Sequence, residues 1–137
     1  MASAAGGCMC GAVRYELNAA PIFMGNCHCR DCQRANGAAY NPAIGVPRSA
    51  MKITGDVKYY ESKTDSGNMT RRAFCPNCGS RLFSDPPFAS DLMVIVASSL
   101  DDPSIFRPAM DIFTSSAQPW DKMDPSLPKF AKMPPTG

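Results

Sequence analysis

Phe74-Cys-Pro-Asn-Cys-Gly-Ser80 carries the strongest structural signal in this sequence. The C-x-x-C spacing followed by glycine predicts a tight turn, because proline presets φ for a turn position and Gly79 can adopt a positive φ directly after the second cysteine. Such a turn aims backbone N–H groups at the two sulfurs and helps to hold them as thiolates. A tetrahedral metal site needs more ligands than this turn supplies, so the others must come from elsewhere in the chain.

The remaining cysteines are also grouped. Cys8 and Cys10 form a C-x-C pair, and residues 27–32 form C-x-C-x-x-C, which brings the total to seven cysteines. On an extended segment, residues i and i+2 point to the same face and their Cα atoms lie about 7 Å apart. Their sulfurs can lean together to about 3.8 Å, the edge of a tetrahedron whose Zn–S bonds are about 2.3 Å. The same pair would be strained as a disulfide. The grouping therefore predicts metal ligands.

Seven thiolates divide most simply into four plus three. Four thiolates make a closed, structural zinc site, whereas three leave one position open for water or substrate, which is the pattern of a catalytic zinc. Spacing alone does not prove this division, but it leaves no ligand over. The first set is Cys8, Cys10, Cys75 and Cys78, and the second is Cys27, Cys29 and Cys32.

Four other interpretations of the cysteines compete with this division. A single zinc with three spare cysteines stays open as the main alternative. An iron–sulfur cluster is disfavoured because the spacings match neither common ferredoxin pattern. Disulfides are disfavoured by the odd number of cysteines and by the reducing compartment that we expect. A thioredoxin-type C-x-x-C would need a βαβ context, which the sequence around Cys75 lacks.

Composition bounds the class of protein. With 137 residues and 45% hydrophobic side chains, the chain is long enough for one domain with a core. A net charge of +2 and a pI near 8.2 are too mild to indicate nucleic-acid binding. The first seven residues lack the basic and apolar regions of a secretory signal, and the longest apolar run, Leu92–Ala97, is far shorter than a membrane span. We expect a cytoplasmic protein without a membrane or nucleic-acid partner.

Apolar residues recur mostly with period two, which predicts a mainly β domain. Residues 28–36 are the best candidate for a helix, with Gly37 as its end. Each cysteine group then lies at the end of a strand. The predicted strands cover residues 13–17, 21–27, 38–46, 51–54, 57–60, 70–74, 81–83, 92–97 and 112–114.

Several strands carry more specific predictions. Pro42 cannot donate a ladder hydrogen bond, so strand 38–46 is expected at a sheet edge or a bulge. Strands 51–54 and 57–60 flank Gly55-Asp56 and are expected to form a hairpin. The continuous apolar strand 92–97 is expected to be buried on both faces.

Two further predictions concern the C-terminal region and the single histidine. The tail from 118 to 137 carries five prolines, and we expect Trp120 and Phe130 to dock it on the core. His28 lies between two cysteines that share one face, so its side chain should point away from them. We therefore interpret it as a structural or solvent-facing histidine.

Three segments of this sequence resemble one known family. They are Gly7-Cys-Met-Cys-Gly-Ala-Val-Arg-Tyr15, Cys27-His-Cys-Arg-Asp-Cys-Gln-Arg34 and Phe74–Ser80. Their order and spacing are similar to those of the glutathione-dependent formaldehyde-activating enzyme family, which includes centromere protein V. Val46-Pro47 and the tail segments Pro119-Trp120-Asp and Leu127-Pro-Lys-Phe130 extend the likeness over nearly the whole chain.

This resemblance implies a single domain over residues 1–137, built of packed antiparallel sheets with zinc. It also implies that the four-cysteine set is the structural site and the three-cysteine set the catalytic one. The family reaction joins formaldehyde to the thiol of glutathione and makes S-hydroxymethylglutathione, so this chain would be a carbon–sulfur lyase with a small thiol substrate. The alternative is a non-catalytic, zinc-stabilised scaffold or ligand-binding domain. Arginines that could pair with substrate carboxylates are Arg30, Arg34, Arg71 and Arg72.

Overall fold

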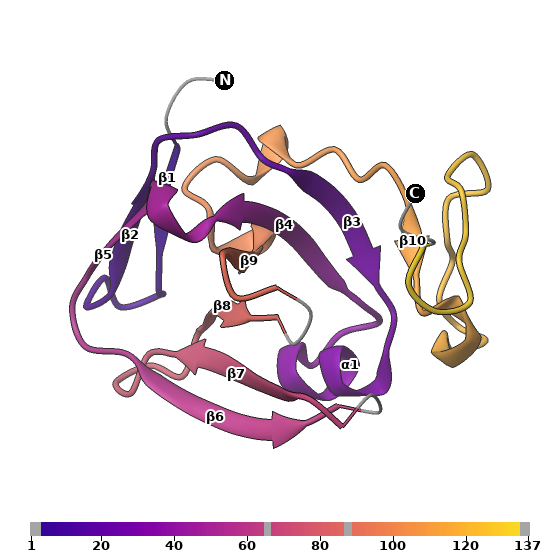
Figure 1. Ribbon diagram of the computed structural model, residues 1–137, viewed down its shortest axis with the longest axis horizontal. Coiled ribbons are helices and arrows are strands. Elements are labelled where there is room, and N and C mark those ends of the chain that lie inside the picture. Colours follow the sequence, from indigo (N-terminus) through magenta and orange to yellow (C-terminus); the bar gives the residue numbers. More distant parts are fainter. Residues whose placement is uncertain (1–3, 65–66, 87–88, 135–137) are drawn as a thin grey trace.

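Two β-sheets and one short α-helix make up the structure, a computed structural model that describes residues 4–64, 67–86 and 89–134 (Figure 1). The predicted mainly β single domain is confirmed. The helix is α1 (Arg30–Asn36), and 3-10 turns cover Arg48–Ala50, Ala97–Ser99, Pro103–Ile105 and Thr114–Ser116. The strands are β1 (Ala4–Gly7), β2 (Arg14–Leu17), β3 (Phe23–Cys27), β4 (Asn41–Pro47), β5 (Met51–Thr54), β6 (Lys58–Lys63), β7 (Met69–Phe74), β8 (Arg81–Asp85), β9 (Leu92–Val96) and β10 (Asp111–Ile112).

The strands form a three-stranded sheet in the order β1-β2-β5 and a seven-stranded sheet in the order β10-β3-β4-β9-β8-β7-β6. Every strand pair is antiparallel except β10 with β3, which is parallel. Within the described ranges, no helix has the length and hydropathy needed to span a bilayer.

The hydrophobic core joins the two sheets. Alternation along β2 buries Tyr15 and Leu17, and the ring of Tyr15 packs edge-to-face on Phe83 of β8 with centroids 6.3 Å apart. The Tyr15 hydroxyl lies 2.6 Å from the hydroxyl of Ser99. The same cluster of buried residues contains two cysteines, Cys8 and Cys75, so the cysteine groups are anchored in the core and not in free loops.

The hairpin predicted for residues 51–60 is wrong. β5 pairs with β2 in the small sheet, whereas β6 pairs with β7 in the large one. Gly55 turns the chain from one sheet to the other at a φ of 96°, and a Cβ there would overlap the backbone carbonyl oxygen of Ala12. The glycine is therefore needed where the chain crosses between the sheets. The pairing of β5 with β2 and of β6 with β7 outweighs the local preference of Gly55-Asp56 for a hairpin turn.

We expect Gly55→Ala to destabilise the protein by more than about 1–3 kcal/mol, the usual cost of forcing an alanine into a left-handed backbone conformation. The excess comes from the clash with Ala12. Gly67→Ala is the matched control, because Gly67 also has a positive φ, 86°, but none of the described residues lies within 4 Å of its missing Cβ. Urea unfolding of both variants measures the difference, and equal losses would contradict the close approach at Gly55.

The expected edge position of strand 38–46 is also wrong, since β4 lies between β3 and β9. Pro42 is accepted there because β9 ends opposite Ala43, where Val96 is the last partner. Pro42 therefore has no residue of β9 opposite it that would need a backbone N–H as donor. On β9 itself, Met93 and Ile95 are buried while Leu92 and Val94 are only half-buried, so just one face is fully enclosed.

The predictions for the helix and for the C-terminal tail are confirmed in part. α1 begins at Arg30, two residues later than predicted, and ends at Gly37, whose φ of 64° confirms it as the stop. Trp120 is 64% exposed and does not dock the tail, contrary to the prediction. Phe130 is half-buried, and its backbone N–H donates to the carbonyl oxygen of Asp111 in β10. The tail thus lies beside β10, at the β3 end of the large sheet (Figure 1).

Candidate metal centres

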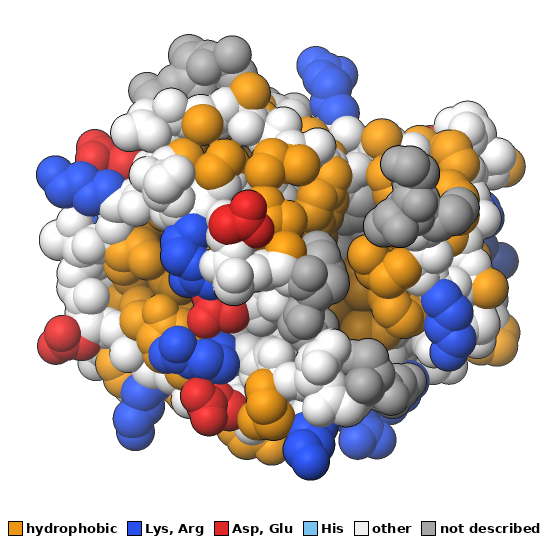
Figure 2. Space-filling model, viewed as in Figure 1, with side chains coloured by type: hydrophobic (Ala, Val, Ile, Leu, Met, Phe, Trp, Pro, Cys, Tyr) orange, Lys and Arg blue, Asp and Glu red, His pale blue; other side chains and the backbone are white. Residues whose placement is uncertain are grey.

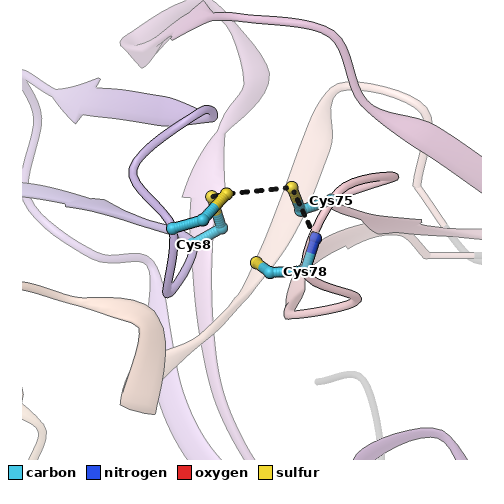
Figure 3. Close-up of side chains that lie close together, drawn as sticks. Cys8, Cys75 and Cys78 are labelled. Atoms are coloured by element: carbon cyan, nitrogen blue, oxygen red, sulfur yellow. Dashed lines mark hydrogen bonds between the residues drawn. The ribbon is translucent and has the colours of Figure 1, made fainter.

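The four-cysteine group lies where the two sheets meet. Cys8 and Cys10 follow β1, and Cys75 and Cys78 follow β7. Their four sulfur atoms all lie within 4.8 Å of one another. The Sγ atoms of Cys8 and Cys10 are 3.6 Å apart, and those of Cys10 and Cys75 are 3.8 Å apart. Figure 3 shows Cys8 facing Cys75 and Cys78 across the gap between their loops.

These distances fit a tetrahedral zinc site, whose sulfur–sulfur edges are about 3.8 Å, and they far exceed the about 2.05 Å of a disulfide. Backbone N–H groups hold the sulfurs in place: Val13 donates to Cys8 at 3.2 Å, and Asn77 donates to Cys75 at 3.3 Å. The expected turn is confirmed, with Gly79 at a φ of 78°. All seven cysteines are free of disulfides. The donor set suits a metal cation that prefers sulfur.

The electrostatics of the turn favour thiolate. The hydroxyl of Ser80 lies 3.2 Å from the sulfur of Cys78, and this hydrogen bond, with backbone donors, lowers the pKa of Cys78 to about 5. The side-chain amide of Asn77 donates to the sulfur of Cys10 at 3.2 Å. Since Cys8 and Cys75 are buried while Cys10 is exposed, the group has one end in the core and one end at the surface.

The three-cysteine group is built by the junction of β3 and α1. Cys27 is the last residue of β3, Cys29 is the N-cap of α1, and Cys32 lies in the first turn of that helix. Their sulfurs also lie within 4.8 Å of one another. The four-plus-three arrangement predicted from spacing is thus what the described residues form, and both groups are able to hold a metal ion.

Charge in this group is shared among the three sulfurs. Hydrogen bonds from the thiols of Cys27 and Cys32, together with the backbone N–H of Cys32 at 3.3 Å, lower the pKa of Cys29 to about 2. The same contacts raise the pKa of Cys27. A dication would find three sulfur ligands already gathered.

His28 points away from the cysteines, as its position between two ligands predicted, but it is buried and not solvent-facing. Its side chain is 1% exposed, with Nδ1 2.6 Å from Asp121 and Nε2 2.9 Å from Asp111. Each ring nitrogen of His28 is thus held by a carboxylate oxygen. The residues of this cluster, which we call the histidine–aspartate cluster, are His28, Asp111, Asp121, Lys129 and Asn26.

Asp111 is the centre of the histidine–aspartate cluster. Its carboxylate also accepts from Lys129 at 2.9 Å and from Asn26 at 3.1 Å. Burial alone would raise the pKa of Asp111, but the hydrogen bonds from His28, Lys129 and Asn26 outweigh it and lower that pKa. The cluster ties the C-terminal tail to the segment that carries Cys27 and Cys29. Sequence reasoning missed it because its acidic members lie over 80 residues from His28 and carry no local motif.

An open cleft of about 860 Å³ runs between the four-cysteine loops and α1. Its walls include Ser80 and Arg81 on one side and Ala35 and Asn36 of α1 on the other. Cys32 lies one turn earlier than Ala35 and Asn36 on the same face of the helix, because residues i, i+3 and i+4 share a face. The three-cysteine group lies at the N-terminal end of the helix that forms one wall of this cleft.

The arginines considered from the sequence are placed differently from one another. Arg71 pairs with Glu61 and Asp85, and its guanidinium stacks on the ring of Tyr59 at 4.0 Å. Its side chain is therefore already bound within the protein. Arg30 donates to Gln33 within α1. Arg72 donates to the hydroxyl of Ser62. On the face in Figure 2, Lys and Arg side chains are scattered among acidic and hydrophobic ones and do not gather into a patch.

Comparison with known proteins gives a family and a fold. The model of the family described as glutathione-dependent formaldehyde-activating enzyme matches residues 3–116. Among solved structures, a Rhodobacter sphaeroides protein from a structural genomics programme has a similar fold, with a TM-score of 0.59 at 15% identity. The alignment covers 92% of this chain and 98% of that one.

Proposed function

The chain belongs to the glutathione-dependent formaldehyde-activating enzyme family, and from this we propose that it is a zinc-dependent carbon–sulfur lyase. Its substrate would be an adduct of a small thiol, such as S-hydroxymethylglutathione. The observation that carries the proposal is the three-cysteine group: three sulfurs gathered at the start of α1, the helix whose later residues line an open cleft. Three protein ligands are the pattern of a zinc that keeps one position for substrate.

Each cysteine has a role in this proposal. Cys27, Cys29 and Cys32 would hold the zinc, and none need be a nucleophile. When bound there, zinc supplies an open coordination position at which a thiol loses its proton near neutral pH. The N–H of Cys32 keeps Cys29 oriented as an acceptor. A second zinc held by Cys8, Cys10, Cys75 and Cys78 would be structural.

A non-catalytic, zinc-stabilised scaffold is the second candidate. One observation favours it: His28, the only histidine in the chain, has both ring nitrogens committed to carboxylates. It is therefore not free to exchange protons with a ligand in the cleft. A lyase of this kind would need its proton transfers to go through the thiol substrate itself or through water.

Metal stoichiometry and reaction kinetics together test the proposal. We expect native mass spectrometry to find about two zinc ions per wild-type chain and about one in the folded triple variant Cys27→Ser, Cys29→Ser, Cys32→Ser. NMR exchange between formaldehyde and glutathione should be accelerated by the wild type and return to the uncatalysed rate with the variant. One tightly held zinc with an inert triplet would favour the scaffold. No acceleration with two zinc ions bound would remove this substrate pair.

A further inference from the structure

We propose that Arg81 is the anchor for a carboxylate group of the thiol substrate, bound in the cleft between the four-cysteine loops and α1. The inference rests on the proposed function, because it assumes that the cleft receives a thiol compound. The four-cysteine and three-cysteine groups supply sulfur ligands only, so recognition of the rest of a substrate requires another group. Arg81 lines the cleft, pairs with no carboxylate among the described residues and has an Nε that, like Oδ1 of Asn36, makes no hydrogen bond there.

Arg81 has unused hydrogen-bonding capacity. Its Nη1 donates to the backbone carbonyls of Ala73 at 3.1 Å and Phe83 at 3.3 Å, and these are its hydrogen bonds among the described residues. Its Nε is buried without any partner in that part of the chain. Nη2 also makes no hydrogen bond within the described residues and, unlike Nε, it is not fully buried. It is therefore the donor that a carboxylate in the cleft can reach, in a charge-assisted hydrogen bond.

Arg81 also has no carboxylate partner. Arg14, Arg48 and Arg71 each pair with a carboxylate, whereas neither Arg81 nor Arg72 does so within the described ranges. Burial and the nearby positive charge of Arg72 lower the pKa of Arg81 to about 10. The negative groups that act on these two arginines are the sulfurs of the three-cysteine group, so a carboxylate bound at Arg81 would be the first carboxylate partner of either.

Arg81 is close to both cysteine groups. It directly follows Ser80 of the four-cysteine turn, and its guanidinium and the sulfur of Cys32 attract each other electrostatically. Arg81 and Asn36 line the same cleft, and Cys32 shares the helix face of Asn36. One small molecule could therefore present a carboxylate to Arg81 and a sulfur to the three-cysteine group. That combination defines the ligand class as a thiol that also carries a carboxylate.

Binding measurements without turnover test this assignment. The probes are S-methylglutathione, which keeps both carboxylates and has no free thiol, and its dimethyl ester, which lacks both negative charges. With zinc-loaded wild type, calorimetry should show the acid binding about ten-fold or more tightly than the ester, as expected for a charge-assisted pair. Arg81→Gln should remove this preference and leave ester binding unchanged. Arg48→Gln is the control, because Arg48 pairs with Asp85 and lies outside the cleft.

The outcomes separate this inference from the proposed function. Equal affinity for acid and ester, or wild-type affinity in folded Arg81→Gln, would overturn the anchor whatever the activity. If Arg81→Gln fails to fold, the Nε–H signal of Arg81 in the wild type decides instead: it should shift with the acid and not with the ester, and no shift overturns the assignment. Arg81-dependent binding without accelerated exchange would support the anchor and contradict the lyase.

Discussion

Cys78→Ser should give a protein that loses about one zinc ion per chain and unfolds or aggregates. A structural zinc contributes roughly 10–16 kcal/mol in small peptides, whereas a whole domain is typically stable by only about 5–15 kcal/mol. The position of the four-cysteine group in the structure explains this expected loss of stability. Cys8 and Cys10 follow a strand of the small sheet, and Cys75 and Cys78 follow a strand of the large one, so the site joins the two sheets. Cys10→Ser should have the same effect.

Cys29→Ser is the matched control, since it removes a sulfur from the other group. Cys29 is the half-buried N-cap of α1, and its group joins the end of one strand to this helix and not one sheet to the other, so its loss should be milder and leave a folded protein. Zinc content by mass spectrometry and secondary structure by circular dichroism measure both variants. Equal damage from Cys10→Ser, Cys78→Ser and Cys29→Ser would contradict the division into a closed and an open group.

The second large effect is expected from Asp111→Ala. This change leaves His28 and Lys129 without their shared carboxylate, and removing one partner of a buried ion pair in this way costs about 3–5 kcal/mol. The side chains of His28 and Asp111 are each 1% exposed, so solvent offers little compensation. The tail from Asp111 onward should detach from β3 and become sensitive to proteases.

Asp101→Ala is its control. Asp101 pairs with Arg14 at the surface, where an ion pair contributes only about 0–1 kcal/mol. Urea unfolding with zinc present compares the two variants, and limited proteolysis follows the tail. A loss below about 1 kcal/mol in both variants would show that the histidine–aspartate cluster does not hold the tail.

The metal-binding groups could be predicted from the sequence because their chemistry is local. Two sulfurs at i and i+2 or i and i+3 are already near one another, and seven cysteines allow few divisions. The turn after β7 was equally predictable, since proline and glycine fix its backbone. For the same reason the helix end at Gly37 was found.

Features that depend on distant residues were not predictable. β1 has the sequence Ala-Ala-Gly-Gly, which carries no strand signal, and it forms because Gly6 has no Cβ to overlap the Tyr15 hydroxyl. The residues around Gly55 have the local pattern of a hairpin. In the structure, however, β5 before this turn pairs with β2, and β6 after it pairs with β7. The path of the C-terminal tail brings Asp111 and Asp121 to His28. The Nε of Arg81 lacks a hydrogen-bond partner because its described neighbours place no acceptor against it, which a local motif cannot reveal.

X-ray absorption at the zinc edge tests the central claim most directly, because it counts the sulfur atoms around the metal. With two zinc ions bound, one closed group and one open group predict a mean of about 3.5 sulfurs per zinc at about 2.3 Å, with the remainder lighter atoms. The triple variant Cys27→Ser, Cys29→Ser, Cys32→Ser should rise to about four. A wild-type protein with two zinc ions and four sulfurs around each, or with sulfurs bonded to each other and no zinc, would contradict the account.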